Sequence, residues 1–124
     1  MAKKVYIPTT KDPNKRGYGQ SIDKPKIKES DIQRDIKTFL QYRGWFVVKI
    51  HQSMGSYKGI ADLYCLKNGL SVWVEVKTPK GRMSEHQERF KDDVEQNGGH
   101  YIVARGIDDV SNLQAEIEIR EMEK

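Results

Sequence analysis

The sequence has little of what secreted, thiolate-binding or membrane-spanning proteins need. Only one of its 124 residues, Cys65, is a cysteine, which excludes an internal disulfide and a cysteine metal cluster. No apolar run approaches the roughly 20 residues of a membrane-spanning helix, and the first residues lack the apolar stretch of a signal peptide. We therefore expect a soluble cytoplasmic protein that does not use a membrane, with Cys65 serving as a small buried hydrophobe.

Proline is scarce outside one region of the chain. Three of the four prolines lie within residues 1–28, where eight lysines and arginines face only two acids and no apolar periodicity is present. These features predict a flexible basic arm over residues 1–28, ahead of a single compact domain over residues 29–124. The arm is either a solvated tail or a segment that contacts DNA or a partner subunit.

Excess positive charge is absent from the C-terminal third, although the whole chain carries a net charge of +4. Residues 29–83 hold nine basic and five acidic side chains, whereas residues 84–124 hold five basic and eleven acidic ones. A polyanion should be attracted to the arm and to the basic half of the domain, and repelled by the acidic half. This distribution predicts a nucleic-acid partner.

Apolar periodicity and turn signals divide the domain into helices and strands. The order predicts an α-β-β-β-α-β-α fold, in which helices flank a mixed central sheet with one parallel crossover. Two Ser-x-x-Gln strings, from Ser30 and Ser84, are typical of the capping boxes that open helices. The predicted elements are a helix over 30–43, a strand over 45–50, a hairpin within 59–82, a helix from 84 to the glycines at 98 and 99, a strand over 100–104, and an acidic amphipathic helix marked by Ile107, Val110, Leu113 and Ile117.

Three charged residues stand in the hairpin among mostly apolar neighbours. An Asn-Gly pair at 68–69 predicts a two-residue type I′ turn, and that register places Asp62 directly opposite Glu75. Lys77 projects from the same face because it lies two residues after Glu75. Facing acids are destabilising unless something compensates them, and two carboxylates at this separation suit a Mg²⁺ ion. The alternative is that Asp62 is an edge or turn residue and that Glu75 and Lys77 form a solvated pair.

These residues resemble a known nuclease pattern. Gly59-Ile60-Ala61-Asp62, followed by the hairpin and Glu75-Val76-Lys77, is similar to the PD-(D/E)XK motif, with Ala61 in place of its proline. The longer string "KESDIQ…GIADLYCL…VWVEVKTPKGRMSEHQERF…GGHYIVAR" resembles the virus-type replication-repair nuclease (VRR-NUC) branch, over about residues 28–110. The resemblance implies a restriction-endonuclease-like core and a metal-dependent phosphodiesterase that acts on DNA.

The resemblance also implies roles for the residues of the hairpin. Asp62 and Glu75 would bind Mg²⁺, or Mn²⁺ in its place, with the Val76 carbonyl as a further ligand. Lys77 would be the catalytic lysine, able to orient a metal-bound water or to stabilise developing charge on a phosphate. No small-molecule cofactor is implied.

Residues on the two flanking helices match outer positions of the family site. Glu29 corresponds to the acid that completes the site through the water shell of the metal, Gln33 lies one turn further on, and Gln87 corresponds to the glutamine after the catalytic strand. Simpler explanations exist, because both glutamines occupy the third position of a capping box and acids are favoured at helix N-termini. Helical spacing nevertheless directs all three toward the predicted sheet.

Several polar residues of the basic half are candidates for contacts with DNA phosphates. They lie in the loop before Asp62 and directly after the catalytic strand. These candidates are Ser53, Tyr57, Lys58, Lys80 and Arg82. Each of them taken alone is better explained as ordinary surface, but as a group they coincide with the basic half of the domain.

The resulting hypothesis is a structure-selective DNA endonuclease. Small stand-alone relatives resemble Holliday-junction resolvases, so we expect a homodimer that cuts branched DNA during DNA repair, from a bacterium, a virus or a phage and in the cytoplasm or at the nucleoid. One alternative is a nicking or restriction-type nuclease subunit of a larger assembly. The other is a DNA-binding module without activity.

Overall fold

The computed structural model describes residues 5–6, 21–22, 26–53 and 57–124, and the predicted basic arm lies almost wholly outside these ranges. Within the described ranges, no helix combines the length and the apolar character needed to cross a membrane. The elements are β1 (Val5–Tyr6), β2 (Ser21–Ile22), α1 (Glu29–Tyr42), β3 (Phe46–Lys49), β4 (Leu63–Lys67), β5 (Leu70–Val76), α2 (Glu85–Gln96), β6 (Tyr101–Ala104), the 3₁₀ helix η1 (Ile107–Val110) and α3 (Leu113–Met122).

Four strands form a mixed sheet in the order β3-β4-β5-β6. The pairs β3–β4 and β4–β5 are antiparallel, whereas β5 and β6 are parallel and are connected through α2. The predicted α/β fold with one parallel crossover is therefore confirmed. The two short strands β1 and β2 pair only with each other, in an antiparallel ladder.

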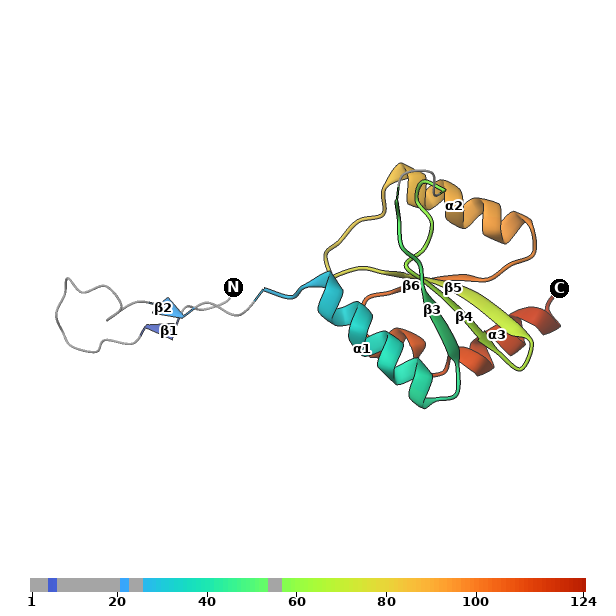
Figure 1. Cartoon of the computed structure of the whole chain (residues 1–124), viewed down its shortest axis with the longest axis horizontal. Helices are drawn as coiled ribbons and strands as arrows, with labels where there is room; N and C mark the ends of the chain where they lie inside the picture. Colours follow the sequence, from blue (N-terminus) through green and yellow to red (C-terminus); the bar gives the residue numbers. More distant parts are fainter. Residues whose placement is uncertain (1–4, 7–20, 23–25, 54–56) are drawn as a thin grey trace.

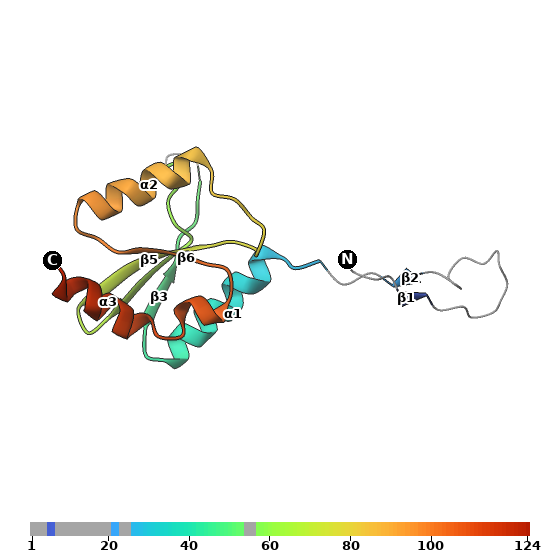
Figure 2. The ribbon, with the colours of Figure 1, turned by 180° about the vertical axis from the view of Figure 1, so that it is seen from behind.

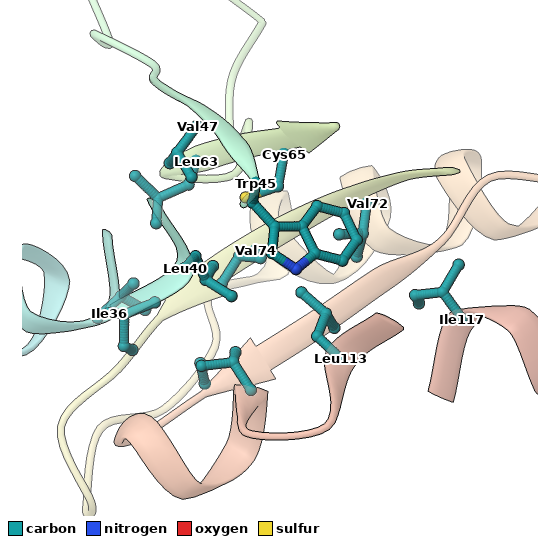
Figure 3. Close-up of a cluster of buried hydrophobic side chains, with 13 residues drawn as sticks. Ile36, Leu40, Trp45, Val47, Leu63, Cys65, Val72, Val74, Leu113 and Ile117 are labelled. Carbon is teal, nitrogen blue, oxygen red and sulfur yellow. The ribbon is translucent and has the colours of Figure 1, made fainter. Parts of the chain in front are cut away.

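Helices cover both faces of the sheet (Figure 1), with α1 and α3 on one face and α2 on the other, as the reverse view shows (Figure 2). The larger core lies on the face of α1 and α3, because alternate residues of β4 and β5 point to that side. Figure 3 shows the indole of Trp45 among strand side chains and Leu113 of α3. Cys65 is buried in this core, as predicted. The buried members are Ile36, Leu40, Trp45, Val47, Leu63, Cys65, Val72, Val74, Val76, Ala104, Val110, Leu113 and Ile117.

A smaller aromatic cluster holds α2 on the opposite face. Phe90 of α2 meets Trp73 of β5 edge to face, with ring centroids 5.2 Å apart, and Tyr101 of β6 at 6.1 Å. Because this cluster centres on β5 and β6, two cross-strand partners on the same face farther along the sheet stay exposed. These are Phe46 of β3, which is 65% exposed, and Leu66 of β4, which is 39% exposed.

The first predicted capping box is wrong and the second is confirmed. Helix α1 begins at Glu29, so Ser30 lies inside the helix, and Lys28 at the cap position makes no side-chain cap bond. Acids at positions 29 and 31 favour the helix N-terminus electrostatically and extend it by one residue beyond the prediction. At α2, the Ser84 hydroxyl accepts the Gln87 N–H at 3.1 Å and the Gln87 side-chain oxygen accepts the Ser84 N–H at 2.9 Å.

The last predicted helix is interrupted. Its apolar positions divide between η1, which ends at the buried Val110, and α3, which begins at the buried Leu113. The Asp109 carboxylate accepts the backbone N–H of Arg105 at 2.8 Å, so it holds η1 against the end of β6. The apolar spacing predicted the burial of Val110, Leu113 and Ile117 correctly, but Ile107 is 39% exposed, and the spacing did not indicate this local bond.

Candidate active site

The hairpin has the turn and the register that the sequence predicts. Asn68 and Gly69 both have positive φ values, 52° and 80°, as a type I′ turn requires. The pairs of β4 and β5 run from Lys67 with Leu70 to Leu63 with Val74. Asp62 is the next residue, just outside the strand rather than within it, and the same register brings it to Glu75.

Backbone and side-chain bonds fix Asp62 between two strands. Its carbonyl accepts the Ile50 N–H beyond β3 at 2.8 Å, and its Oδ2 atom accepts the Val76 N–H of β5 at 2.8 Å. The carboxylate thus takes a backbone donor at the end of the β4–β5 ladder. This bond holds the Asp62 side chain against Glu75.

Glu75 is a buried acid that is only partly hydrogen-bonded. It is 1% exposed, and its Oε2 atom accepts a bond from the Gln87 amide at 2.9 Å and lies 3.8 Å from the Lys77 ammonium. Its Oε1 atom is buried and has no hydrogen-bond partner among the described residues. An ionised carboxylate with an unpaired oxygen is costly to bury, so this atom favours either a proton or a cation.

The surroundings of Glu75 favour its protonated form. Burial is the largest cause, followed by the negative charge of Asp62, and together they raise the pKa of Glu75 from 4.5 to about 8 although the Lys77 ammonium opposes them. In its protonated form Glu75 can donate a hydrogen bond to Asp62, and this bond and the charge of Glu29 raise the pKa further. In the absence of a cation, these surroundings therefore favour a proton on Glu75 at neutral pH.

Gln87 forms the predicted cap and also bonds to Glu75, while its role in the reaction stays a prediction. Its side-chain oxygen caps α2 at Ser84, while its side-chain amide donates to Glu75. The capping bond fixes which way the amide group points, because the oxygen is already engaged. The start of α2 is thereby tied to the buried acid.

Glu29 and Gln33, the two predicted site residues of α1, interact less closely with Glu75 than Gln87 does. Glu29 is exposed at the first position of the helix and reaches Glu75 only through its charge, the smallest of the effects on that pKa. Gln33 is half-buried, and within the described residues it makes no hydrogen bond to Asp62 or Glu75. Their roles in the site stay predictions.

Arg105 positions the loop after β5, a contact that sequence reasoning missed. Its Nη1 atom donates to the carbonyls of Thr78 at 2.8 Å and Gly81 at 2.7 Å. This loop carries the exposed Lys80 and the exposed Arg82, two of the candidate DNA contacts. The only sequence signal for these bonds is that Arg105 directly follows the predicted strand over 100–104.

The remaining candidate DNA contacts lie in the loop before Asp62. The Tyr57 hydroxyl donates to Asp93 at 2.6 Å, and its ring lies edge-on to Phe90, so this side chain supports the packing of α2. Lys58 is exposed beside it. Ser53 is also exposed and directly precedes residues 54–56, which lie outside the described residues.

The donor atoms fit a hard divalent cation that keeps part of its water shell. No group of three or more His, Cys, Asp or Glu side chains that could hold a metal ion occurs in the described parts of the chain. Mg²⁺ is usually bound by only one or two carboxylates together with several waters, which the pair Asp62 and Glu75 can provide. The buried, unpartnered Oε1 atom of Glu75 is the observation that favours a cation here.

Two comparisons by sequence found nothing, and one by structure found relatives. No family model matches the chain, and no curated protein matches it. A solved structure named "VRR_NUC domain" is 26% identical, with a TM-score of 0.61, and covers 70% of this chain and 94% of that chain. A second, named "VRR_NUC domain protein", is 17% identical, with a TM-score of 0.62, and covers 76% of this chain and 90% of that chain. The resemblance predicted from the sequence and the nuclease-like fold are confirmed.

The raised pKa of Glu75 predicts how stability changes with pH when no metal is present. Between about pH 4.5 and 8 the folded protein holds a proton on Glu75 that the unfolded chain has released, so the free energy of unfolding should fall as pH rises. The slope from one such proton is at most about 1.4 kcal/mol per pH unit. Urea denaturation in EDTA from pH 5 to 8 should show this loss in the wild type and a flatter profile in Glu75→Gln. Parallel profiles would contradict the assignment.

Proposed function

We propose that this protein is a metal-dependent DNA endonuclease that hydrolyses phosphodiester bonds. The single observation that carries the proposal is the buried Glu75, whose free oxygen stands beside Asp62 with Lys77 3.8 Å from the other oxygen. A structural ion pair would not leave one carboxylate oxygen unpaired next to a second acid. The similarity to two VRR_NUC structures supports the same activity.

Each residue of the site has a definite task in this proposal. Asp62 and Glu75, with the Val76 carbonyl, would hold Mg²⁺ or Mn²⁺, and Glu29 would contact its water shell. A bound ion supplies Lewis-acid stabilisation of the phosphate and makes a bound water more acidic. The Lys77 ammonium donates to a phosphate oxygen or orients the attacking water.

The bonds seen in the structure keep these groups oriented. Gln87 holds one oxygen of Glu75, so the other oxygen stays directed to the cation site. The Val76 N–H orients Asp62 in the same way. Such orientation lowers the reorganisation that the reaction requires.

We further propose that the substrate is branched DNA, such as a Holliday junction, and that the enzyme is a homodimer active in DNA repair. A domain of this size contacts little DNA alone. The exposed pair Phe46 and Leu66 lies beside the free edge of β3, and an antiparallel edge can pair with its own copy about a two-fold axis. A second copy of the chain is therefore the occupant that this edge fits.

The dimer proposal is tested by mass in solution. The wild type should have twice the mass of the chain in light scattering after gel filtration, and Phe46→Glu should shift the protein toward the monomer because it places a charge at the shared edge. Tyr42→Glu, on the exposed face of α1, is the matched control and should leave the mass unchanged. A monomeric wild type, or a dimeric Phe46→Glu, would contradict the proposal.

Cleavage assays test the endonuclease proposal. Asp62→Asn, Glu75→Gln and Lys77→Met should each lower the cleavage rate by at least about 100-fold, because each removes a group that acts on the scissile phosphate or its metal. Lys91→Met is the matched control, since Lys91 is paired with Glu95 on the surface of α2. Circular dichroism should show that all four variants are folded.

The substrate separates the proposed function from its alternatives. Four-way junctions, flaps and linear duplexes should be compared with Mg²⁺, with Mn²⁺ and with EDTA. Preferential cleavage of junctions supports a resolvase, whereas nicking of linear duplex supports the nicking or restriction-type alternative. Wild-type cleavage by Glu75→Gln would rule out the assigned site, and DNA binding without cleavage under any divalent ion would indicate a binding module.

A further inference from the structure

A small pocket with three nitrogen-bearing side chains lies between the loop before Asp62 and the first half of α2. It has a volume of about 200 Å³ and is lined by Tyr57, Lys58, His86 and Arg89, which we call the basic pocket. We infer that the basic pocket binds a second phosphate group of the DNA, separate from the one that is cut. This inference rests on the proposed function, because it takes DNA as the ligand.

The fold brings the members of the basic pocket together through one close backbone contact. Gly59 has a φ of +81°, and a Cβ atom at this position would lie 2.2 Å from the His86 carbonyl oxygen. Only glycine allows the chain to approach the first turn of α2 so closely. Lys58 is thereby placed next to His86 and Arg89, which are far from it in the sequence.

Among the residues that the structure describes, Lys58 and Arg89 have no acidic partner. Arg89 and Asp93 are four residues apart on α2, a spacing at which they would ordinarily pair. Here the Asp93 carboxylate accepts the Tyr57 hydroxyl instead. In residues 26–53 and 57–124, neither Lys58 nor Arg89 forms an ion pair, although Glu85 and Glu88 lie on the same helix. Tyr57 is therefore a wall of the pocket, and Lys58 and Arg89 are left to bind an external anion.

The chemistry of the pocket favours a phosphate. The guanidinium of Arg89 can donate two parallel bonds to phosphate oxygens, the Lys58 ammonium adds a point charge, and the His86 ring supplies a further N–H. The phosphate is either an internal diester of the strand or a monoester at a strand end.

The pocket also lies close enough to the candidate active site for one DNA strand to reach both. Lys58 precedes Asp62 by four residues, so their Cα atoms are at most about 14 Å apart. His86 directly precedes Gln87, which bonds to Glu75. One strand of DNA rises by roughly 3.4 Å per nucleotide, so a phosphate in the pocket lies within a few nucleotides of the scissile one. Occupation of the pocket would add binding energy for the strand that reaches the carboxylates.

DNA binding measured without divalent ions tests the basic pocket independently of cleavage. Fluorescence anisotropy in EDTA should show about tenfold weaker binding for Arg89→Ala and for Lys58→Ala, and the slope of log K against log salt should fall by about one for each. Lys91→Ala, on the same helix but paired with Glu95, is the control and should match the wild type. Arg89→Lys should keep the salt slope and lose part of the affinity, because it keeps the charge but not the fork.

Cleavage kinetics and the DNA ends complete the test. With Mg²⁺, Arg89→Ala should raise KM about tenfold and leave kcat unchanged, because the pocket binds substrate and does not act on the scissile bond. An equal effect on DNA with 5′-hydroxyl and 5′-phosphate ends indicates an internal phosphate, and an effect confined to the phosphorylated ends indicates a terminal one.

Failure of the pocket and failure of the endonuclease give different results. Normal affinity and salt slope in both alanine variants would overturn the pocket, even if the wild type cleaves DNA. A wild type that binds DNA with the predicted variant effects but cleaves nothing would support the pocket and overturn the endonuclease proposal. Absence of DNA binding by the wild type would overturn both.

Discussion

The contact between Asp62 and Glu75 is the constraint on which the rest of the site depends. Two acids meet where the hairpin joins the centre of the sheet, and Glu75 is 1% exposed there. Like charges in a low-dielectric environment oppose folding unless a proton, a cation or hydrogen bonds compensate them. The surrounding bonds from Gln87 and Val76 and the charge of Lys77 compensate only in part, because one oxygen of Glu75 stays unpaired. The site therefore carries an electrostatic cost that a bound cation would relieve.

The two faces of the sheet have different tasks. On the face of α1 and α3, a continuous apolar core supplies most of the burial and contains Trp45 and Cys65. On the face of α2, a small aromatic cluster holds the helix, and the charged groups lie at one end of it. Helix α2 thus connects three features: it packs on Trp73, it orients Glu75 through Gln87, and it contributes His86 and Arg89 to the basic pocket.

Local signals predicted the hairpin well because its geometry is decided locally. The Asn-Gly turn sets the register, and the register sets the meeting of Asp62 and Glu75, so the central pair could be derived from sequence. The capping box at Ser84 is likewise a local arrangement. At Ser30 the same pattern failed, because acids at the helix start extend α1 beyond it.

Contacts between distant segments were not predictable in the same way. Arg105, at the end of β6, bonds to the loop after the neighbouring parallel strand β5, and no local pattern indicates which carbonyls it will meet. The basic pocket depends on Gly59 packing against the start of α2, and the sequence showed this glycine only as the first residue of the motif that ends at Asp62. The engagement of Asp93 by Tyr57, which leaves Arg89 unpaired, is equally a product of the tertiary structure.

Calorimetry of Mn²⁺ binding at pH 7 tests the central claim most directly. With a pKa of about 8, Glu75 must lose its proton when the cation binds, so the measured heat should vary with the ionisation enthalpy of the buffer and correspond to release of about one proton. Above pH 9 the proton release should disappear. The Glu75→Gln variant should bind Mn²⁺ more weakly and release no proton at pH 7. Binding heat that is independent of the buffer at pH 7, or no binding by the wild type, would contradict a cation site at Asp62 and Glu75.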